Sequence, residues 1–265
     1  MPSCVSRDSS EDKGEKKMKI LLVGAGGHMA AEVVKLCEAG YCGAELAAGV
    51  SHREIDNFPV PCAAGFAAAE TNVDCIVDFS NHSDTAELLA FAVENSLPLV
   101  LATTGQTPEE KAAIAEAAKK IPLFFAANFS MGVALLIELA KKTAAAFPEA
   151  EIEIIEKHHN RKLDAPSGTA LAIADAIKEV RPEVWANTGR SGHAKRTPEE
   201  IGIHAVRMGN IVGDHEVIIG TQSQTITLKH EAHSRSLFAE GALTAARFLQ
   251  GREAGLYNMK SLLED

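Results

Sequence analysis

Long apolar runs and positive charge are both scarce in this sequence. No stretch of the 265 residues approaches the roughly 20 consecutive apolar residues that a transmembrane helix requires. Asp and Glu outnumber Lys and Arg by 36 to 26, and the net charge is −10. A nucleic-acid duplex repels a surface of that sign. The sequence therefore predicts neither a membrane partner nor a nucleic-acid partner.

Cysteine is also scarce, and its spacing matches no known ligand pattern. The number of cysteines is odd, no Cys-x-x-Cys pair occurs, and none is spaced with His as in a zinc site. We expect thiols in a reducing compartment, which favours a cytoplasmic protein, and we expect no metal site. The five cysteines are Cys4, Cys37, Cys42, Cys62 and Cys75.

The N-terminal segment has almost no apolar residues. Residues 1–17 mix Ser, Lys, Asp and Glu. A secretory signal needs an apolar centre, and a transit peptide contains few acidic residues, so neither is indicated. We expect a disordered extension over 1–17 and a fold that begins near Met18.

Residues 18–128 alternate between short apolar runs and amphipathic stretches. This alternation is typical of a parallel sheet covered by helices on both faces. We predict an α/β fold whose first domain, 18–128, is a Rossmann-type, doubly wound, dinucleotide-binding domain. The expected strands cover 19–23, 45–50, 75–79, 98–102 and 122–126. The expected helices cover 29–39, 83–94 with Ser83 as N-cap, and 107–120.

The pattern changes after residue 128. Helices are expected over 133–147 and 170–180, and strands over 151–157, 202–207, 214–221 and 224–230. The last three strands alternate with a period of two, which fits a mixed or antiparallel sheet with one open face. We predict a mixed α/β substrate-binding and oligomerisation domain over 129–237. The segment 238–265 contains an apolar-faced helix that we expect to return to the first domain.

A glycine-rich turn follows the first expected strand. The residues are Gly24, Ala25, Gly26, Gly27, His28 and Met29, a variant of G-x-G-x-x-G with Ala30 at the last position. Between a strand and a helix, such a turn lets backbone N–H groups approach a pyrophosphate. The alternative is an ordinary tight turn. We predict a dinucleotide site.

The end of the second expected strand bears on the choice of cofactor. An acid at this position accepts a hydrogen bond from the ribose of NAD. Here Ser51, His52 and Arg53 stand before the first acid, Glu54. A hydroxyl and two basic side chains suit a 2′-phosphate better, so NADPH is favoured over NADH. The alternative is a polar loop without such a role.

The segment from Glu156 to Ala170 concentrates basic side chains before a helix. His158, His159 and Lys162 precede a helix start at Ser167-Gly168-Thr169. Free N–H groups and hydroxyls at a helix start bind an anion such as a carboxylate. The histidines can titrate near neutral pH, and Lys162 can neutralise a carboxylate or deliver a proton. A single histidine would more often be an ordinary surface residue, but the cluster predicts a functional site.

The same segment resembles the signature of the dihydrodipicolinate reductase family. The pattern is His-His-x-x-Lys-x-Asp-Ala-Pro-Ser-Gly-Thr-Ala, and the resemblance extends over nearly the whole chain from about Lys19. Further matching stretches are Gly24 to Met29, Ala102-Thr-Thr-Gly105, Ala126-Ala-Asn-Phe-Ser130 and Arg207-x-Gly-x-Ile-Val-Gly213.

The resemblance implies roles for individual residues. His158 and Lys162 match the catalytic positions. Substrate contacts are implied for His159, Gly168 and Thr169, and we also expect them for Ser167, at the helix start, and for Thr104. Cofactor contacts are implied for Gly24 to Met29, Ala102, Thr103, Thr104, Ala126, Ala127, Asn128 and Phe129, whereas the expected contacts of Ser51 and His52 rest on their own chemistry after the second strand.

The resemblance also implies an activity and an assembly. The reaction is the reduction of hydroxy-tetrahydrodipicolinate, a small dicarboxylate, with NADPH or NADH in diaminopimelate and lysine biosynthesis. The implied assembly is a homotetramer formed through the sheet of the second domain. Two alternatives remain open: an amino-acid dehydrogenase of the aspartate or diaminopimelate type, and a non-catalytic NADPH sensor. Ala102, His28 and Ser51 depart from residues common in the family.

Overall fold

The computed structural model describes residues 17–53 and 55–265. The expected N-terminal extension lies outside the described residues, except for Lys17. The chain forms two compact units. Unit 1 contains the chain up to Ser130 together with Ser236–Asp265, and unit 2 contains Met131–Arg235.

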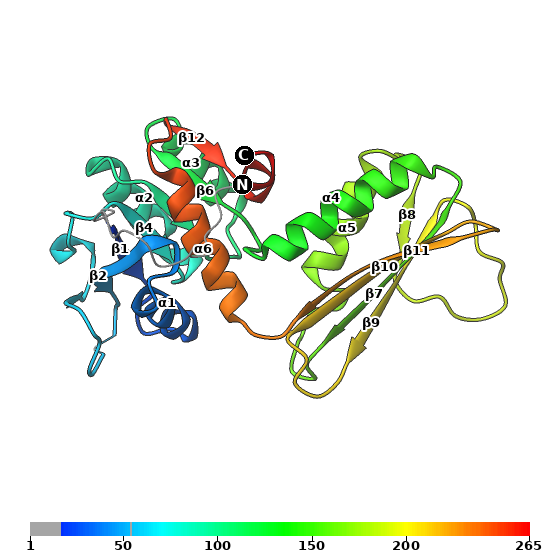
Figure 1. Ribbon diagram of the computed structural model, residues 1–265, viewed down its shortest axis with the longest axis horizontal. Helices are drawn as coiled ribbons and strands as arrows, with labels where there is room; N and C mark the ends of the chain where they lie inside the picture. Colours follow the sequence, from blue (N-terminus) through cyan, green and yellow to red (C-terminus); the bar gives the residue numbers. More distant parts are fainter. Residues whose placement is uncertain (1–16, 54) are drawn as a thin grey trace, which may run out of the picture. The chain divides into compact units, whose positions relative to one another are not determined.

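Unit 1 is built on a seven-stranded sheet in which every recorded pairing is parallel. The strand order is β12-β6-β5-β4-β1-β2-β3, and Figure 1 shows its strands and helices. The predicted doubly wound parallel sheet is confirmed. The strands are β1 (Met18–Val23), β2 (Ala44–Val50), β3 (Cys62–Ala63), β4 (Cys75–Asp78), β5 (Leu99–Leu101), β6 (Pro122–Phe125) and β12 (Gly255–Tyr257).

Helices cover both faces of this sheet because the chain winds in opposite directions from β1. Right-handed crossovers place the helix after β1 on one face and those after β4 and β5 on the other. Accordingly, α1 contacts α6, and α2 contacts α3. The helices are α1 (His28–Glu38), α2 (Thr85–Glu94), α3 (Pro108–Ala117), α6 (Ser236–Leu249) and α7 (Met259–Glu264).

The register of the sheet aligns the ends of its central strands. Val23 pairs with Val50 on one side and with Asp78 on the other. Asp78 pairs with Leu101, which in turn pairs with Phe125. Because the strands are parallel, the segments that follow these five residues all leave the sheet at one edge. That edge is where open α/β sheets bind ligands.

Some local details of unit 1 differ from the sequence expectations. The helix expected from Ser83 is preceded by a 3-10 turn (His82–Asp84), and the side chain of Asn81, not Ser83, accepts the capping bond, from the N–H of Ser83. The strands β3 and β12 and the helix α7 were not predicted. They are two, three and six residues long, too short for a hydrophobic period to be visible.

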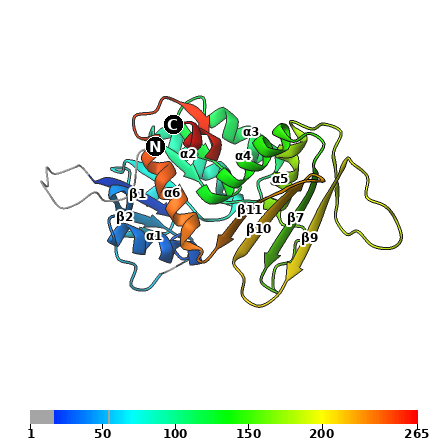
Figure 2. The ribbon, with the colours of Figure 1, turned by 45° about the vertical axis from the view of Figure 1, so that its right-hand side comes forward.

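Unit 2 contains a mixed five-stranded sheet of order β11-β10-β7-β9-β8. The pairs β10–β11 and β10–β7 are antiparallel, whereas β7–β9 and β8–β9 are parallel. The predicted mixed domain is confirmed, and Figure 2 shows β11, β10, β7 and β9 side by side. The strands are β7 (Glu151–His158), β8 (Trp185–Asn187), β9 (Glu200–Arg207), β10 (Gly213–Gly220) and β11 (Thr225–Ala232).

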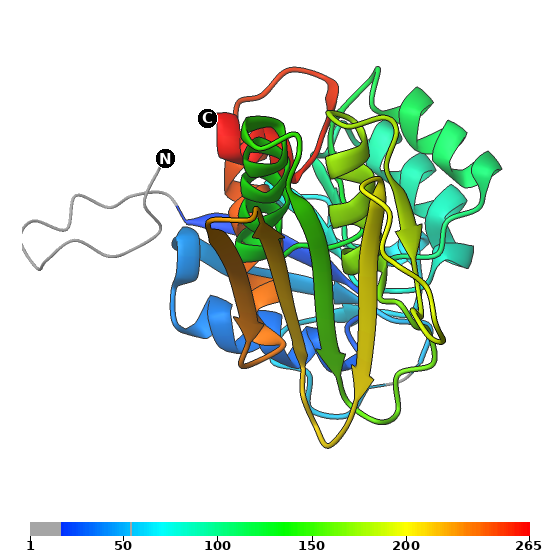
Figure 3. The same ribbon diagram turned by 90° about the vertical axis from the view of Figure 1, so that its right-hand side faces the viewer.

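Two helices of unit 2, α4 (Met131–Ala146) and α5 (Gly168–Lys178), lie on the same face of this sheet. Figure 3 shows the strands from the opposite, open face, with the helices behind them. Alternate residues of β7 are buried, and they include Ile152 and Ile154. The same alternation buries two polar residues, Glu156 and His158, at the end of the strand.

Two further sequence expectations concern membrane-spanning helices and cysteine thiols. No helix in the described part of the chain is long and apolar enough to span a membrane. The expectation of cysteine thiols holds for Cys37, Cys62 and Cys75. It is wrong for Cys42, which is disulfide-bonded. Its sequence spacing gave no sign of a partner, because pairing depends on the distance between Cα atoms in space.

Candidate active site

The glycine-rich turn of unit 1 requires glycine at its first position. Gly24 has a φ of +84°, and a Cβ built on it would lie 2.5 Å from the carbonyl oxygen of Phe79. The N–H groups of Gly24 and Ala25 both donate to the carbonyl of Val50, at 3.0 and 3.1 Å. The backbone at Gly24 therefore passes so close to the Phe79 carbonyl, just after β4, that a residue with a side chain would not fit there.

The turn leads directly into α1. Gly27 is the N-cap residue and provides no side-chain capping bond. Gly26, Gly27 and His28 are exposed, and Met29 is half-buried. An uncapped helix start that is open to solvent offers N–H groups and the positive end of the helix dipole to an anion. Together with the glycine turn, these residues fit the pyrophosphate of a dinucleotide.

The segment after β2 is more constrained than the sequence suggested. The Ser51 hydroxyl donates to the carbonyl of Arg53 at 2.9 Å and accepts from its N–H at 3.1 Å. The His52 Nε2 atom lies 3.3 Å from the Asp84 carboxylate. The Ser51 hydroxyl thus closes a local turn, and Asp84 offsets the basic character of His52. Arg53 is exposed.

The segments after β4 and β5 are tied together at the same edge by Asp78. Asp78 is 1% exposed, and its carboxylate accepts from the N–H and hydroxyl of Ser80 at 3.0 and 2.5 Å. Burial raises the pKa of Asp78, although the hydrogen bonds from Ser80 oppose this effect. The N–H of Ala102 donates to the Asp78 carbonyl at 3.0 Å. Asp78 therefore fixes the path of the chain around Thr103.

The remaining cofactor residues expected in unit 1 flank these ties. Thr103 is buried, whereas Thr104 is exposed. After β6, Ala127 is exposed, and Asn128 accepts a hydrogen bond from the N–H of Ser130 at 2.8 Å. The register of the sheet brings these segments and the glycine turn to the same edge. The residues predicted to hold the cofactor are thus gathered at one place in unit 1.

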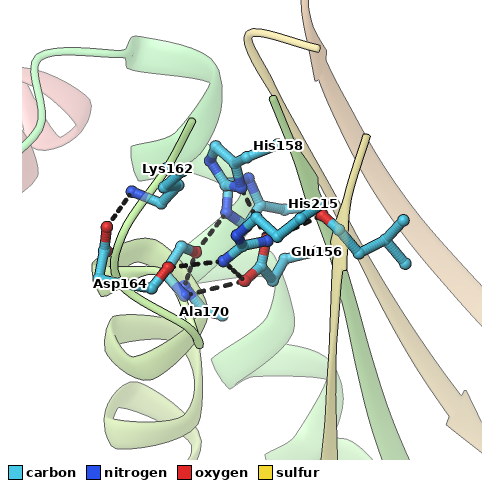
Figure 4. A network of polar contacts seen from close by, with 9 residues as sticks. Glu156, His158, Lys162, Asp164, Ala170 and His215 are labelled. Carbon is cyan, nitrogen blue, oxygen red and sulfur yellow. Dashed lines mark hydrogen bonds and ion pairs between the residues drawn. The ribbon is translucent and has the colours of Figure 1, made fainter. Parts of the chain in front are cut away.

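Unit 2 has a buried ion-pair network at the end of its sheet (Figure 4). Glu156 on β7 is fully buried and accepts two hydrogen bonds from the Arg207 guanidinium on β9, at 2.6 and 2.7 Å. It also accepts from His158 Nδ1 at 2.6 Å and from the Ser167 N–H at 3.0 Å. Burial acts to raise the pKa of Glu156, but the Arg207 and His158 bonds outweigh it and hold the pKa below its usual range.

A second histidine packs against this network. The rings of His158 and His215 lie 5.2 Å apart in an edge-to-face arrangement. His215, on β10, is 3% exposed, and its Nε2 lies 2.9 Å from the Ser167 hydroxyl. Burial lowers the pKa of His215 to about 4, and repulsion between the two rings adds to this shift when both are protonated. His215 is therefore neutral at physiological pH.

Lys162 lies in the loop between β7 and α5. Its side chain is 22% exposed, and Nζ lies 2.9 Å from the Asp164 carboxylate. That hydrogen bond lowers the pKa of Asp164. The Asp164 carbonyl accepts from Arg207 at 2.8 Å. The loop that carries the lysine is therefore attached to the buried network.

The helix start of α5 supplies fewer open groups than the sequence suggested. Ser167 is 2% exposed, its N–H is bound to Glu156, and its hydroxyl caps the helix by accepting from Ala170. The groups of the helix start that reach the surface are those of Gly168, which is exposed, and Thr169, which is half-buried. His159 lies in the same loop, with its N–H donating to the carbonyl of Ile211 at 2.8 Å.

Comparisons with known proteins agree over both units. Residues 18–129 match the family model "Dihydrodipicolinate reductase, N-terminus", and residues 132–263 match "Dihydrodipicolinate reductase, C-terminus". The chain belongs to the dihydrodipicolinate reductase family. The predicted resemblance is confirmed.

Individual relatives are similar over most of their length. A 4-hydroxy-tetrahydrodipicolinate reductase of Clostridium tetani is 43% identical over 251 residues, which cover 93% of this chain and 97% of that protein. One of Caldanaerobacter subterraneus subsp. tengcongensis is 42% identical over 253 residues, 93% and 98% of the two chains. Among solved structures, a dipicolinate-bound dihydrodipicolinate reductase of Paenisporosarcina sp. TG-14 is 27% identical with a TM-score of 0.76, covering 92% and 98%.

Within unit 2, the structure brings several predicted residues of this family together. His158 contacts Glu156, which binds the N-terminus of α5, and Lys162 joins the network through Asp164 and its loop (Figure 4). Sequence reasoning did not assign a role to Glu156, Arg207 or His215. Two signals were available: Glu156 and His158 are polar residues at the buried positions of an alternating strand, and a buried charge needs a partner.

Proposed function

We propose that this protein reduces 4-hydroxy-tetrahydrodipicolinate to tetrahydrodipicolinate with a nicotinamide cofactor, a step of diaminopimelate and lysine biosynthesis. Curated relatives that are about 40% identical over nearly their whole length bear the name of this reductase. The observation that carries the proposal for this chain is the cluster in unit 2. There a histidine, a lysine and a helix N-terminus surround the place where a dicarboxylate can be held.

Lys162 is the proposed cation for a substrate carboxylate and a proton donor. Its ammonium is partly exposed, and its partner Asp164 is 58% exposed. A surface ion pair of this kind contributes little free energy, so a substrate carboxylate can replace Asp164 at small cost. Gly168 and Thr169 at the start of α5, His159 in the loop and Thr104 in unit 1 are the proposed substrate contacts. Ser167 is proposed to act through the helix start that it caps.

The reaction consumes one hydride, supplied by a bound reduced nicotinamide, and one proton, and it releases water. The protein's own part is to hold the substrate, to deliver the proton and to neutralise the two carboxylates. His158 is proposed to assist as an acid or base, or by its charge.

The proposed cofactor site is the edge of the unit 1 sheet, with NADPH preferred and NADH accepted. Gly24 to Met29 would hold the pyrophosphate, and the segments 102–104 and 126–129 would line the nicotinamide half. Arg53 is proposed as the residue that binds the 2′-phosphate, with His52 as a weaker contributor because Asp84 already neutralises it.

The proposed assembly is a homotetramer in the cytoplasm, formed through the open face of the unit 2 sheet. No described helix of unit 2 covers that face. An uncovered sheet face in a protein of this size commonly meets a second copy. Light scattering measures the assembly directly, and a monomer at micromolar concentration would contradict the proposal.

The decisive experiment follows the oxidation of the reduced nicotinamide by its absorbance, with the substrate generated in situ and NADPH and NADH compared. We expect oxidation that depends on the substrate and is faster with NADPH. A protein that binds the cofactor but oxidises neither form would contradict the proposal and favour a cofactor sensor. Oxidation driven by an amino acid in place of this substrate would favour an amino-acid dehydrogenase.

A further inference from the structure

Glu156 occupies an unusual position for a carboxylate. It lies on β7 at 0% exposure, on the face that otherwise packs apolar residues such as Ile152 and Ile154 against the helices. An isolated carboxylate there would cost several kcal/mol. Its four hydrogen bonds connect it to Arg207 on β9, to His158 at the end of β7 and to Ser167 at the start of α5. The fixed charge of such a group can orient the side chains that are bonded to it.

We infer that Glu156 is a positioning residue, which fixes His158 with the proton on Nδ1 and thereby presents Nε2 as the nitrogen that exchanges a proton or binds the substrate. This inference rests on the proposed function, because it assigns the orientation of a residue in the same site. It adds a residue and a defined tautomer to that site.

The hydrogen-bond chemistry supports this assignment. An ionised carboxylate is an acceptor only, so the 2.6 Å contact between Glu156 Oε2 and His158 Nδ1 requires a hydrogen on Nδ1. Arg207 keeps the carboxylate ionised by donating to both of its oxygens. Neutral His158 then has a free lone pair on Nε2 alone.

The Nε2 side of the His158 ring lies against a glycine. Gly213, at the start of β10, has no side chain, and a Cβ built on it would lie 3.0 Å from His158 Nε2. Any larger residue at 213 would press on that nitrogen. Titratable groups recorded near the His158 ring are Glu156 on its own strand, His215 on β10 and His159 in the loop, and Arg207 on β9 reaches the ring through its ion pair with Glu156.

Glu156 also holds two other parts of the site. Its Oε1 atom accepts from the Ser167 N–H, and so it anchors the start of α5. Arg207, which pairs with Glu156, donates to the carbonyl of Asp164, and so it anchors the loop that carries Lys162. One buried ion pair thus connects the histidine, the lysine loop and the helix start.

The first test measures the tautomer in the unaltered full-length protein. Nitrogen-15 chemical shifts of the His158 ring, recorded at a pH at which the ring is neutral, distinguish Nδ1–H from Nε2–H. We expect Nδ1–H. An Nε2–H tautomer would overturn the inference. This measurement needs no variant to fold and no turnover, so it stands even if the proposed reaction is wrong.

The second test uses Glu156→Gln. Each carboxylate oxygen of Glu156 accepts hydrogen bonds from two donors. Glutamine replaces one of these oxygens with an NH₂ group, which cannot accept a hydrogen bond. Two donors therefore lose their acceptor in either orientation of the amide. We expect kcat to fall by roughly 100-fold, as for a mis-set histidine tautomer. The KM for the substrate should rise by a smaller factor, because Glu156 also anchors the helix start and the lysine loop, and the KM for the cofactor should change by less than about threefold. Glu156→Asp, which keeps the charge, should restore part of kcat.

The matched control is Glu200→Gln. Glu200 is also a buried carboxylate paired with an arginine, Arg190, but it lies at the start of β9, at the opposite end of the sheet from His158. We expect kcat to change less than about twofold, because no proton-transfer group depends on it. An equal loss of kcat in both variants, or a loss confined to KM in Glu156→Gln, would overturn the inference. Absence of turnover in the unaltered protein would instead contradict the proposed function.

Discussion

The two candidate sites of this protein are built from different materials. The site of unit 1 is made mainly of backbone: a glycine turn, an uncapped helix start and five aligned strand ends. The site of unit 2 is made of side chains that converge from β7, β9, β10 and a loop. A backbone site tolerates little change at its glycines but much change in its side chains, whereas a side-chain site depends on each charged partner.

The two sites also differ in how they stabilise charged groups. In unit 1, the N–H groups and the dipole at the start of α1 can bind an anion. These groups belong to the helix backbone, so the site needs no buried formal charge. Unit 2 buries formal charges and must compensate each one, as Arg207 does for Glu156. The first arrangement is suited to holding a large invariant cofactor, and the second to orienting a few reacting atoms.

The largest effect is expected in unit 2, from Lys162→Ala. Loss of a cation that binds the substrate and donates a proton should lower kcat/KM by about 10³-fold, while binding of the cofactor persists. Steady-state kinetics and a cofactor titration measure the two separately. Lys178→Ala, at the exposed end of α5, serves as the control. Unchanged turnover in Lys162→Ala would remove this residue from the mechanism.

In unit 1, Gly24→Ala should break the backbone site. The positive φ and the 2.5 Å approach to the Phe79 carbonyl should cost roughly 3 kcal/mol of unfolding free energy and abolish cofactor binding. Calorimetric titration and urea denaturation check both. Gly40→Ala is the matched control: φ is +68° there, but nothing lies within 4 Å, so we expect a loss of only about 1 kcal/mol and normal cofactor binding. Normal cofactor binding in Gly24→Ala would refute the backbone description.

A third prediction concerns the pH dependence that buried side chains give to unit 2. The pKa of His215 is about 4 in the folded protein, against an ordinary 6.5. Between these values the unfolded chain binds a proton that the folded protein does not, so the free energy of unfolding falls as the pH drops from 6.5 to about 4. The loss has an upper limit of roughly 3 kcal/mol.

The variant His215→Gln removes this titration. Urea midpoints measured at pH 7 and at pH 4.5 should therefore differ less in the variant than in the unaltered protein, even if the variant is less stable at both. Both proteins share the low-pH loss caused by carboxylates such as Glu156, so the comparison isolates His215. An equal difference in the two proteins would contradict the buried, neutral state of this residue.

The smallest effect is expected at the edge of the unit 1 site. Arg53→Ala should raise the KM for NADPH about tenfold, the equivalent of about 1.4 kcal/mol, and leave the KM for NADH unchanged. His52→Ala should shift NADPH affinity less, since Asp84 already neutralises this side chain. Parallel kinetics with the two cofactors measure both. Equal changes for NADPH and NADH would show that Arg53 does not contact the 2′-phosphate.

Much of the fold was predictable from local patterns. The strands Met18–Val23 and Ala44–Val50 lie within one residue of the expected runs, because buried parallel strands are continuous apolar segments. The start of α3 was predicted from Pro108 at its first position, and Thr107 caps it. The pairs that need distant partners, such as β12 with β6, left no local signal.

The sequence by itself determined the class of each unit, the glycine turn and the segment that carries His158 and Lys162. These features depend on neighbours within a few residues, where hydrophobic period, φ restriction and helix capping act. Only the tertiary structure decided that Glu156 meets Arg207 across 51 positions and that Ser167 meets His215 across 48. It also decided that His52 is paired and that Ser167 faces inward. Such partners are chosen by strand register and burial, because a buried charge is stable only where the fold brings its counter-charge.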